Sequence, residues 1–152
     1  MILGLVSDTH GLLRDNALRA LQNSGRIIHA GDVGDDPEIL EALASFAPVT
    51  AVRGNVDTAE WATKLPPTTV VEIGAVRIYV LHDVKELKRS SIPSGTSIVV
   101  SGHSHKPGQA TREGILYINP GSAGPRRFNL PITVARLDLD RKPWECEFID
   151  VS

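Results

Sequence analysis

Five apolar stretches of this chain end in side chains that can bind a metal ion. There are seven such side chains, namely Asp8, His10, Asp32, Asn55, His82, His103 and His105. Two carboxylates, one amide and four imidazoles are too many donors for a single zinc ion, but they suit two divalent ions that share a bridging carboxylate. The mixture of imidazole and oxygen donors favours manganese, iron, zinc, cobalt or nickel over calcium or magnesium. The sequence therefore predicts a site for two divalent ions of that group.

The stretches that lead into these side chains are predicted β-strands. Residues 2–6 lack the alternation of a half-exposed strand, so we expect a strand buried on both faces. An amphipathic helix is predicted over 14–23, a strand over 26–30, a helix starting at 36–38 and a strand over 48–53. This βα succession predicts parallel pairing with right-handed crossovers. Because ligands gather at the carboxyl ends of such strands, we expect the seven side chains to converge.

The rest of the chain is predicted to be mostly strand. Residues 61–67 are expected to be irregular, and residues 84–89 to form a short basic helix. The predicted strands are 68–73 and 75–81, joined as a hairpin at Gly74, then 97–101, then 109–111 paired with 115–118, and finally an antiparallel pair, 131–138 and 144–151. Apolar and acidic side chains alternate over 144–148, which predicts one buried and one wet face for the last strand.

Composition narrows the class of protein. A chain of 152 residues fits one domain, over 1–152, and can bury a full core. The 16 basic and 18 acidic residues form no long run of one sign, so we expect neither an extended nucleic-acid surface nor a membrane-binding one. The single cysteine, Cys146, excludes an intramolecular disulfide and favours a reducing, cytoplasmic location. Met1 leads straight into the first strand, and no apolar stretch approaches the roughly 20 residues that span a bilayer.

Five short motifs also carry a resemblance to a known family. They are Asp8-x-His10, Gly31-Asp32, Gly54-Asn55-x-Asp57, His82 and Gly102-His103-Ser104-His105. In this order they resemble the boxes of the calcineurin-like metallophosphoesterase superfamily. The short chain, the third box and the loop over residues 119–126 are similar to its small YfcE-like phosphodiesterase branch. The resemblance implies an α/β (α+β) fold, a four-layer αββα sandwich of two stacked mixed β-sheets flanked by helices.

The resemblance further implies how the donors divide between the ions. Asp8, His10 and His105 would bind one ion, Asn55, His82 and His103 the other, and Asp32 would bridge the two. The implied reaction is hydrolysis of a small phosphate ester, most simply a phosphodiester, by attack of a metal-bridging hydroxide. We expect two divalent ions per chain, manganese first, with iron, zinc, cobalt and nickel as alternatives. Asn55 would also reach the phosphate through its amide NH2 group.

One position departs from the wider superfamily. Val56 stands where many members have a histidine that assists the leaving group, and valine cannot donate a proton. Because general acid catalysis typically contributes about 10²–10⁴-fold, we expect slow turnover or a preference for esters whose alcohol or phenol leaves easily. Asp57 is either a catalytic-site residue that orients a ligand imidazole or an aspartate that only shapes a turn. Arg126 and Arg127 either bind the substrate phosphate, with Arg126 as the first choice, or are solvated loop arginines.

Alternatives to an enzyme are open at this stage. A binding or scaffold protein could keep the fold without turnover, as a retromer subunit of similar fold does, and a structural site could hold a single ion. None of the seven donors is missing, which favours the enzyme. His29 lies inside an apolar stretch, and we expect it to be a hydrogen-bonded core histidine rather than a metal ligand. A homo-oligomer is also compatible with the sequence.

Overall fold

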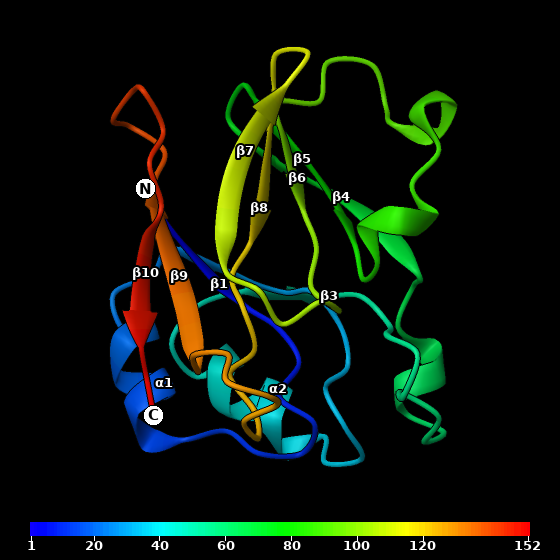
Figure 1. Cartoon of the computed structure of the whole chain (residues 1–152), viewed down its shortest axis with the longest axis vertical. Helices are drawn as coiled ribbons and strands as arrows, with labels where there is room; N and C mark the ends of the chain where they lie inside the picture. Colours follow the sequence, from blue (N-terminus) through cyan, green and yellow to red (C-terminus); the bar gives the residue numbers. More distant parts are fainter.

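The computed structural model describes residues 1–152 and contains two stacked five-stranded sheets (Figure 1). Sheet A consists, in spatial order, of β10 (Glu147–Asp150), β9 (Thr133–Asp138), β1 (Ile2–Val6), β2 (Arg26–His29) and β3 (Val49–Ala51). Sheet B consists of β4 (Thr68–Ile73), β5 (Val76–Leu81), β6 (Ile98–Val100), β8 (Ile115–Asn119) and β7 (Gly108–Arg112). The predicted pair of stacked mixed sheets is confirmed.

Each sheet contains three parallel neighbours, which set the direction of its functional edge. β1, β2 and β3 pair in parallel in sheet A, as predicted, and β5, β6 and β8 pair in parallel in sheet B. The predicted hairpins also form, because β4 pairs with β5, β7 with β8 and β10 with β9, all antiparallel. The carboxyl ends of three parallel strands therefore lie together at one edge of each sheet.

The last strand is shorter than predicted at its amino end. The amide of Gln109, in β7, accepts a hydrogen bond from the Cys146 N–H at 2.6 Å and donates one to the Trp144 carbonyl at 3.1 Å. These backbone groups are thus bonded to a side chain of sheet B, and the pairing of the last strand with β9 begins only at Glu147. The predicted burial is confirmed, since Trp144, Cys146 and Phe148 pack against the core between the sheets.

Two short α-helices cover sheet A. α1 (Asp15–Leu21) and α2 (Glu38–Ala44) lie together below sheet A in Figure 1. Their apolar side chains join those of β1 and β2 in one cluster, with Leu21 and Leu43 fully buried. The Glu38 N–H donates to Asp36 Oδ1 at 2.9 Å, which satisfies an otherwise free first-turn donor. Neither helix has the length or the apolar character to cross a membrane.

The outer face of sheet B carries 3₁₀ turns instead of an α-helix. The basic helix predicted over 84–89 is replaced by η2 (Val84–Glu86) and η3 (Arg89–Ser91). The third such turn, η1 (Ala62–Lys64), lies elsewhere, in the segment predicted to be irregular. Consecutive serines at 90 and 91 compete for backbone hydrogen bonds, and Pro93 disfavours helix at the residue before it. Helices therefore flank the sandwich on one side, and short turns flank it on the other.

The core between the sheets fixes how their edges meet. Leu3 and Leu5 of β1 face Ile78 and Val80 of β5 across this layer, and all four are fully buried. Successive residues of a strand face opposite sides of the sheet, so Gly4 and Val6 of β1 face the helices. This packing holds the carboxyl end of β1 against the carboxyl ends of β5 and β6.

Gly4 allows α1 to pack closely on β1. A Cβ atom at Gly4 would lie 2.6 Å from the Ser24 hydroxyl oxygen and 3.0 Å from a Leu21 methyl carbon, both from the end of the first βα unit. We predict that Gly4→Ala lowers the free energy of unfolding by about 1–3 kcal/mol through overpacking. Gly108→Ala is the matched control, because a Cβ there meets nothing within 4 Å. Urea unfolding of both variants measures this, and equal stabilities would contradict it.

Candidate metal centre

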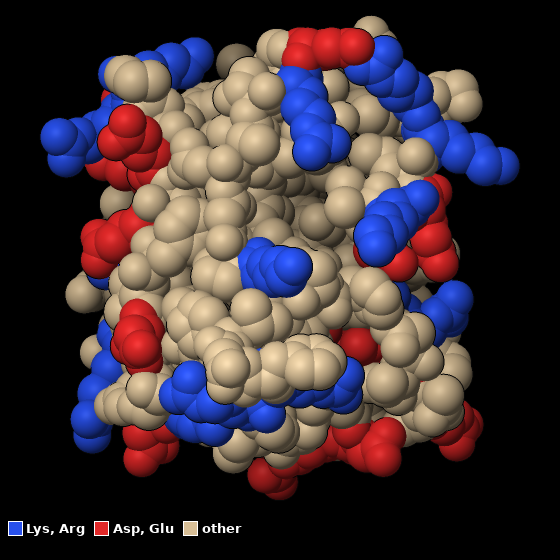
Figure 2. Space-filling view, viewed as in Figure 1, with Lys and Arg blue, Asp and Glu red and all other residues tan.

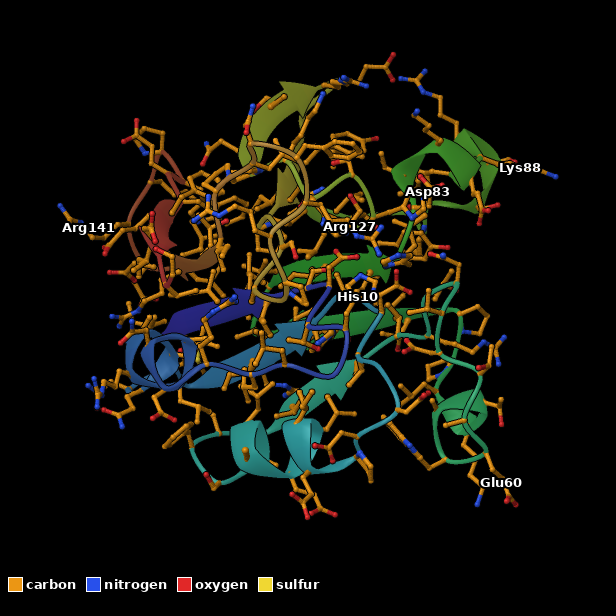
Figure 3. The ribbon with its side chains drawn as sticks, turned by 60° about the horizontal axis from the view of Figure 1, so that its bottom comes forward. His10, Glu60, Asp83, Lys88, Arg127 and Arg141 are labelled. Carbon is orange, nitrogen blue, oxygen red and sulfur yellow. The ribbon has the colours of Figure 1, made fainter.

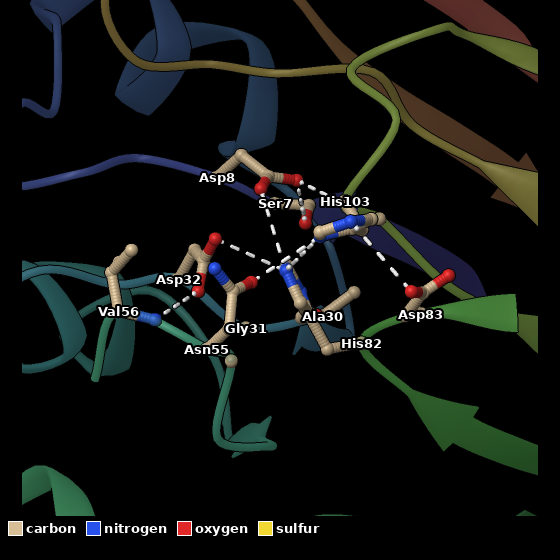
Figure 4. A network of polar contacts seen from close by, with 12 residues as sticks. Ser7, Asp8, Ala30, Gly31, Asp32, Asn55, Val56, His82, Asp83 and His103 are labelled. Carbon is tan, nitrogen blue, oxygen red and sulfur yellow. Dashed lines mark hydrogen bonds and ion pairs between the residues drawn. The ribbon is translucent and has the colours of Figure 1, made fainter. Parts of the chain in front are cut away.

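The seven predicted donors converge at the carboxyl edges of the two sheets. Two groups form, each with its candidate ligand atoms within 4.8 Å of one another: Asp8 with His10 and His105, and Asp32 with His82 and His103. Each group combines residues that follow sheet A with residues that follow sheet B. Figure 3 shows where His10 lies, and Figure 4 shows the contacts of Asp8 and of the second group.

Asp8 is the most buried of the donor residues. Its side chain has 0% exposure, and Oδ2 accepts hydrogen bonds from the Ser7 hydroxyl at 2.6 Å and from the His103 N–H at 3.0 Å. Oδ1 accepts no hydrogen bond and instead lies 3.3 Å from His105 Nε2 and 3.5 Å from His10 Nε2. One oxygen of Asp8 thus holds the carboxylate in place, while the other faces the imidazoles.

The charges in this cluster stabilise one another. Burial alone would raise the pKa of Asp8, but the contacts with His10 and His105 and the charge of His82 outweigh it, and the pKa lies well below its ordinary value. Burial likewise raises the pKa of Asp32, but the contacts with His82 and with the Val56 N–H outweigh this effect and lower the pKa below its ordinary value. Both aspartates are therefore carboxylates at neutral pH.

The Ala30 carbonyl fixes the orientation of the His82 ring. Its Nδ1 lies 2.7 Å from the Ala30 carbonyl oxygen, which can only accept, so Nδ1 carries a proton. Nε2 then faces Asp32 Oδ2 at 3.1 Å and Asp8 Oδ1 at 3.8 Å. Burial lowers the pKa of His82, but the contact with Asp32, the charge of Asp8 and the Ala30 carbonyl raise it to about 9.

The backbone at the donors is strained. Asp8, His10, Asp32, His103 and His105 have φ values of 57°, 46°, 55°, 68° and 64°. For residues other than glycine this left-handed region costs roughly 1–3 kcal/mol each, and such residues cluster at functional sites. The surrounding contacts must therefore hold these donors in positions that the free backbone avoids.

Glycines let neighbouring segments approach the carboxylates. A Cβ at Gly54 would lie 2.0 Å from Asp32 Oδ1, and a Cβ at Gly102 would lie 1.9 Å from Ser7 Oγ and 2.6 Å from Asp8 Oδ2. Only a residue without a side chain fits at these two positions. The glycine that precedes Asn55 and the one that precedes His103 thus have a packing function.

The donor set fits divalent cations. Asp8 Oδ1 and His10 Nε2 are buried without a hydrogen-bond partner, and both face the space shared by the first group. Asn55 Oδ1 lies 3.2 Å from His103 Nδ1, so the amide oxygen also reaches the second group. A transition-metal site requires carboxylate oxygens and imidazole nitrogens that converge and keep their lone pairs free of hydrogen bonds.

Comparison with known families identifies the superfamily of the chain. A family model described as "Calcineurin-like phosphoesterase superfamily domain" matches residues 1–142. The chain belongs to this superfamily. The resemblance of the five motifs is therefore confirmed, and the motifs coincide with the residues that converge at the strand ends.

Two relatives within the superfamily match most of the chain. A probable metallophosphoesterase of Methanothermobacter thermautotrophicus is 30% identical and is covered over 88% of its length by 93% of this chain. A phosphodiesterase of Methanocaldococcus jannaschii is 27% identical, with 95% of this chain covering 96% of that protein. Superfamily membership and these names support divalent metal binding and hydrolysis of phosphate esters.

Solved structures of the superfamily share the fold. An archaeal phosphodiesterase superposes with a TM-score of 0.79 at 22% identity, over 98% of this chain and all of that chain. YfcE of E. coli, a phosphoesterase, superposes with a TM-score of 0.72 at 24% identity over the full length of both chains. Vps29 of Entamoeba histolytica, complexed with Zn²⁺, superposes with a TM-score of 0.74 at 20% identity over the full length of both chains.

Asp57 forms hydrogen bonds with backbone N–H groups and with no imidazole of the two donor groups. Its two oxygens accept hydrogen bonds from the Gly34 N–H at 3.0 Å and the Gly54 N–H at 2.8 Å. The side chain is 2% exposed and joins the segment after β2 to the turn that carries Asn55. The structure thus favours the turn-aspartate interpretation over a direct catalytic contact, and Asp57 acts as a positioning residue.

Arg126 bonds within its own loop. Its Nη1 donates to the Leu130 carbonyl at 3.1 Å, and the side chain does not line the pocket beside the donors. That pocket, of about 530 Å³, is bordered by Asn55, His82 and His103 and extends to Tyr79 and Lys88. The predicted substrate contact of Arg126 thus has no support here.

Two supporting residues were not predicted from the sequence. Ser7 holds Asp8, and Asn119 holds the loop of His103 and His105 by donating to the Gly102 carbonyl at 2.9 Å and to Ser104 Oγ at 3.1 Å. Asn119 Oδ1 also accepts from the Gly121 N–H at 2.9 Å. An asparagine directly before Pro-Gly is the sequence signal for such a turn.

His29 is a core histidine, as predicted. Its Nδ1 accepts the Gly31 N–H at 3.1 Å, so Nε2 carries the proton. Nε2 lies 3.0 Å from Thr9 Oγ1, which itself donates to the Val33 carbonyl at 2.8 Å. Burial, the largest effect, lowers the pKa of His29 to about 4.

We predict that His29 makes the metal-free protein sensitive to mild acid. Between its ordinary pKa of 6.5 and about 4, the unfolded chain binds a proton at this residue and the folded chain does not. Stability therefore falls as pH decreases through this window, by on the order of 3 kcal/mol in total. An NMR titration of the His29 ring should give a midpoint near 4. A midpoint at the ordinary value, or an unchanged pH dependence of unfolding in His29→Gln, would contradict the prediction.

Proposed function

We propose that this protein is a dinuclear metal-dependent phosphodiesterase. The observation that carries the proposal is the convergence of two donor groups around the buried, unpartnered Oδ1 of Asp8. Membership of the calcineurin-like phosphoesterase superfamily supports phosphate-ester hydrolysis, and the phosphodiesterase of M. jannaschii supports the diester. The proposal takes residues 1–152 as one metallophosphoesterase domain.

The two donor groups support a division of the ligands between two ions. Asp8, His10 and His105 would hold one ion, and Asn55, His82 and His103 the other. Asp32 Oδ2 lies 3.1 Å from His82 Nε2 and 3.6 Å from His10 Nε2, between the two groups, which supports its assignment as the bridge. When bound, the ions supply an activated water and offset the negative charge of the phosphate.

The chain's own residues would bind and orient the ester. The exposed amide of Asn55 can donate to a phosphate oxygen through its NH2 group while its oxygen faces His103. The adjoining pocket of about 530 Å³ has the size of a small-molecule site and would seat the organic part of the substrate. Its lining includes Arg53 and Lys88 as well as Asp83 and Glu86, so neither sign of charge dominates.

The remaining expectations belong to the proposal. The mixture of imidazole and oxygen donors suits manganese, iron, zinc, cobalt or nickel, and manganese is the first choice among them. Cys146 is a free thiol, which suits the reducing cytoplasm as the location. Basic and acidic side chains are interspersed on the face in Figure 2, which suits a small ester substrate better than a nucleic acid. A homo-oligomer stays a prediction.

Metal removal tests the enzyme against the scaffold. We predict that hydrolysis of a bis-aryl phosphodiester requires added Mn²⁺, is abolished by a chelator and returns when Mn²⁺ is restored. Asp32→Asn should lose more activity than the about 10–100-fold typical of residues that only support a ligand. Asp35→Asn is the matched control, because Asp35 is an exposed aspartate outside both groups.

Metal analysis of the same samples separates the alternatives. Two ions per chain support the dinuclear site, whereas one tightly held ion supports a single structural site. Two ions without any chelator-sensitive hydrolysis would favour the scaffold alternative.

A second prediction concerns Val56. Its side chain is 37% exposed and its N–H donates to Asp32 Oδ1 at 3.0 Å, so position 56 borders the site without offering a proton. We predict that the wild-type rate falls steeply as the leaving alcohol becomes more basic. Val56→His should flatten this dependence by raising the rate of alkyl esters up to about 10²-fold, the low end for general acid catalysis. Val56→Gln controls for size, and equal slopes for both variants would refute the assignment.

A further inference from the structure

We propose that Asp83 orients His103 and thereby sets the affinity of the second metal ion, an inference that rests on the proposed dinuclear function. Asp83 directly follows His82 at the end of β5, outside the motifs that predicted the site. It lines the substrate pocket together with His103. Asp83 is a positioning residue in this proposal, because it acts through an imidazole.

The ring of His103 spans the distance from the donor cluster to Asp83 (Figure 4). Its Nδ1 lies 3.2 Å from Asn55 Oδ1 and 3.4 Å from His82 Nε2, within the second donor group. Its Nε2 lies on the other side, 3.6 Å from Asp83 Oδ2. One nitrogen thus faces the metal site and the other faces a carboxylate.

A carboxylate at Nε2 selects the useful tautomer. Because an ionised carboxylate only accepts hydrogen bonds, it favours the proton on Nε2 and leaves the lone pair of Nδ1 for a cation. His82 shows the same arrangement with the nitrogens exchanged, since its Nδ1 faces the Ala30 carbonyl and its Nε2 faces the cluster. Both imidazoles of the second group therefore have an oxygen acceptor behind them.

His103 needs this partner more than the other histidines do. Its side chain is 43% exposed, compared with 14% for His10, 7% for His82 and 6% for His105. On its opposite side the ring contacts Asn55 through Nδ1 and approaches His82 edge-on, with the ring centroids 5.2 Å apart. Packing therefore restrains the ring on one side only, and Asp83 supplies the restraint on the other.

Asp83 is itself held in position. Its Oδ1 accepts the Lys85 N–H at 3.0 Å and caps η2, which leaves Oδ2 for His103. The capping function alone does not account for the direction of Oδ2. Glu86 lines the same pocket with an equal charge but makes no ion pair with His103, so it provides a matched control.

The test compares Asp83→Asn with Glu86→Gln. Asparagine keeps an oxygen that can cap η2 but presents an amide NH2 to Nε2, which favours the wrong tautomer. We expect calorimetry with Mn²⁺ to show about 10–100-fold weaker binding of the second ion in Asp83→Asn, with the first ion unchanged. Glu86→Gln should bind both ions as the wild type does. Asp83→Ser, which retains a capping hydroxyl, repeats the test should Asp83→Asn fold poorly.

A second readout needs neither metal nor activity. Without metal, Asn55 Oδ1 competes with Asp83 by accepting a proton on Nδ1, so ¹⁵N NMR of the neutral His103 imidazole should show a larger share of the proton on Nε2 in the wild type than in Asp83→Asn. Unchanged tautomer and unchanged affinities in Asp83→Asn would overturn the proposal, as would equal weakening of both ions in both variants. A wild type that binds two ions without hydrolysis would refute the proposed function while these measurements still decide the role of Asp83. If the wild type binds one ion, the NMR result decides it alone.

Discussion

The constraint on which the rest of the structure depends is the full burial of the Asp8 carboxylate. An isolated ion in a protein interior costs several kcal/mol even after relaxation, so the chain must surround this charge with compensating groups. Ser7 and the His103 N–H satisfy one oxygen, and the imidazoles of His10 and His105 face the other. Because His105 lies in the loop between β6 and β7 of sheet B, the charge is compensated only when the two sheets are docked. The stacking of the sheets and the assembly of the site are thus one event.

The strand ends meet this constraint at a local cost. Five of the donors have left-handed backbone conformations, and glycines at 54 and 102 let other segments approach within contact of the carboxylates. The polar atoms of Asp57 and Asn119 form hydrogen bonds with backbone groups in the turns beside the donors. Such positions are unfavourable for an isolated chain, and the close packing of Leu3, Leu5 and their partners between the sheets maintains them. The apolar core therefore stabilises a polar edge that could not form by itself.

Much of this arrangement is predictable from the sequence, for a physical reason. Asp8, Asp32 and His82 follow apolar runs closely, and the direction of parallel strands then brings them to a common edge. What the sequence does not reveal depends on contacts between distant residues. The Gln109 side chain takes the hydrogen bond of the Cys146 N–H that pairing with β9 was expected to use. The role of Asp57 depends on its bond with Gly34, which lies 23 residues away. The 3₁₀ turns over 84–91 and the contact of Asp83 with His103 likewise require the outer face of sheet B to be in place.

Each donor group contains residues from both sheets, and this has a consequence for the protein in the cell. An ion bound by Asp8 and His105, or by Asp32 and His82, is a cross-link between two halves of the sandwich. Ligand binding at 100 times the dissociation constant stabilises a folded chain by about 2.7 kcal/mol. Where the metal is scarce, this link would be lost, local opening would become more frequent and proteases would gain access to the strand ends. The abundance of the protein would then follow the metal supply, even where its synthesis is constant.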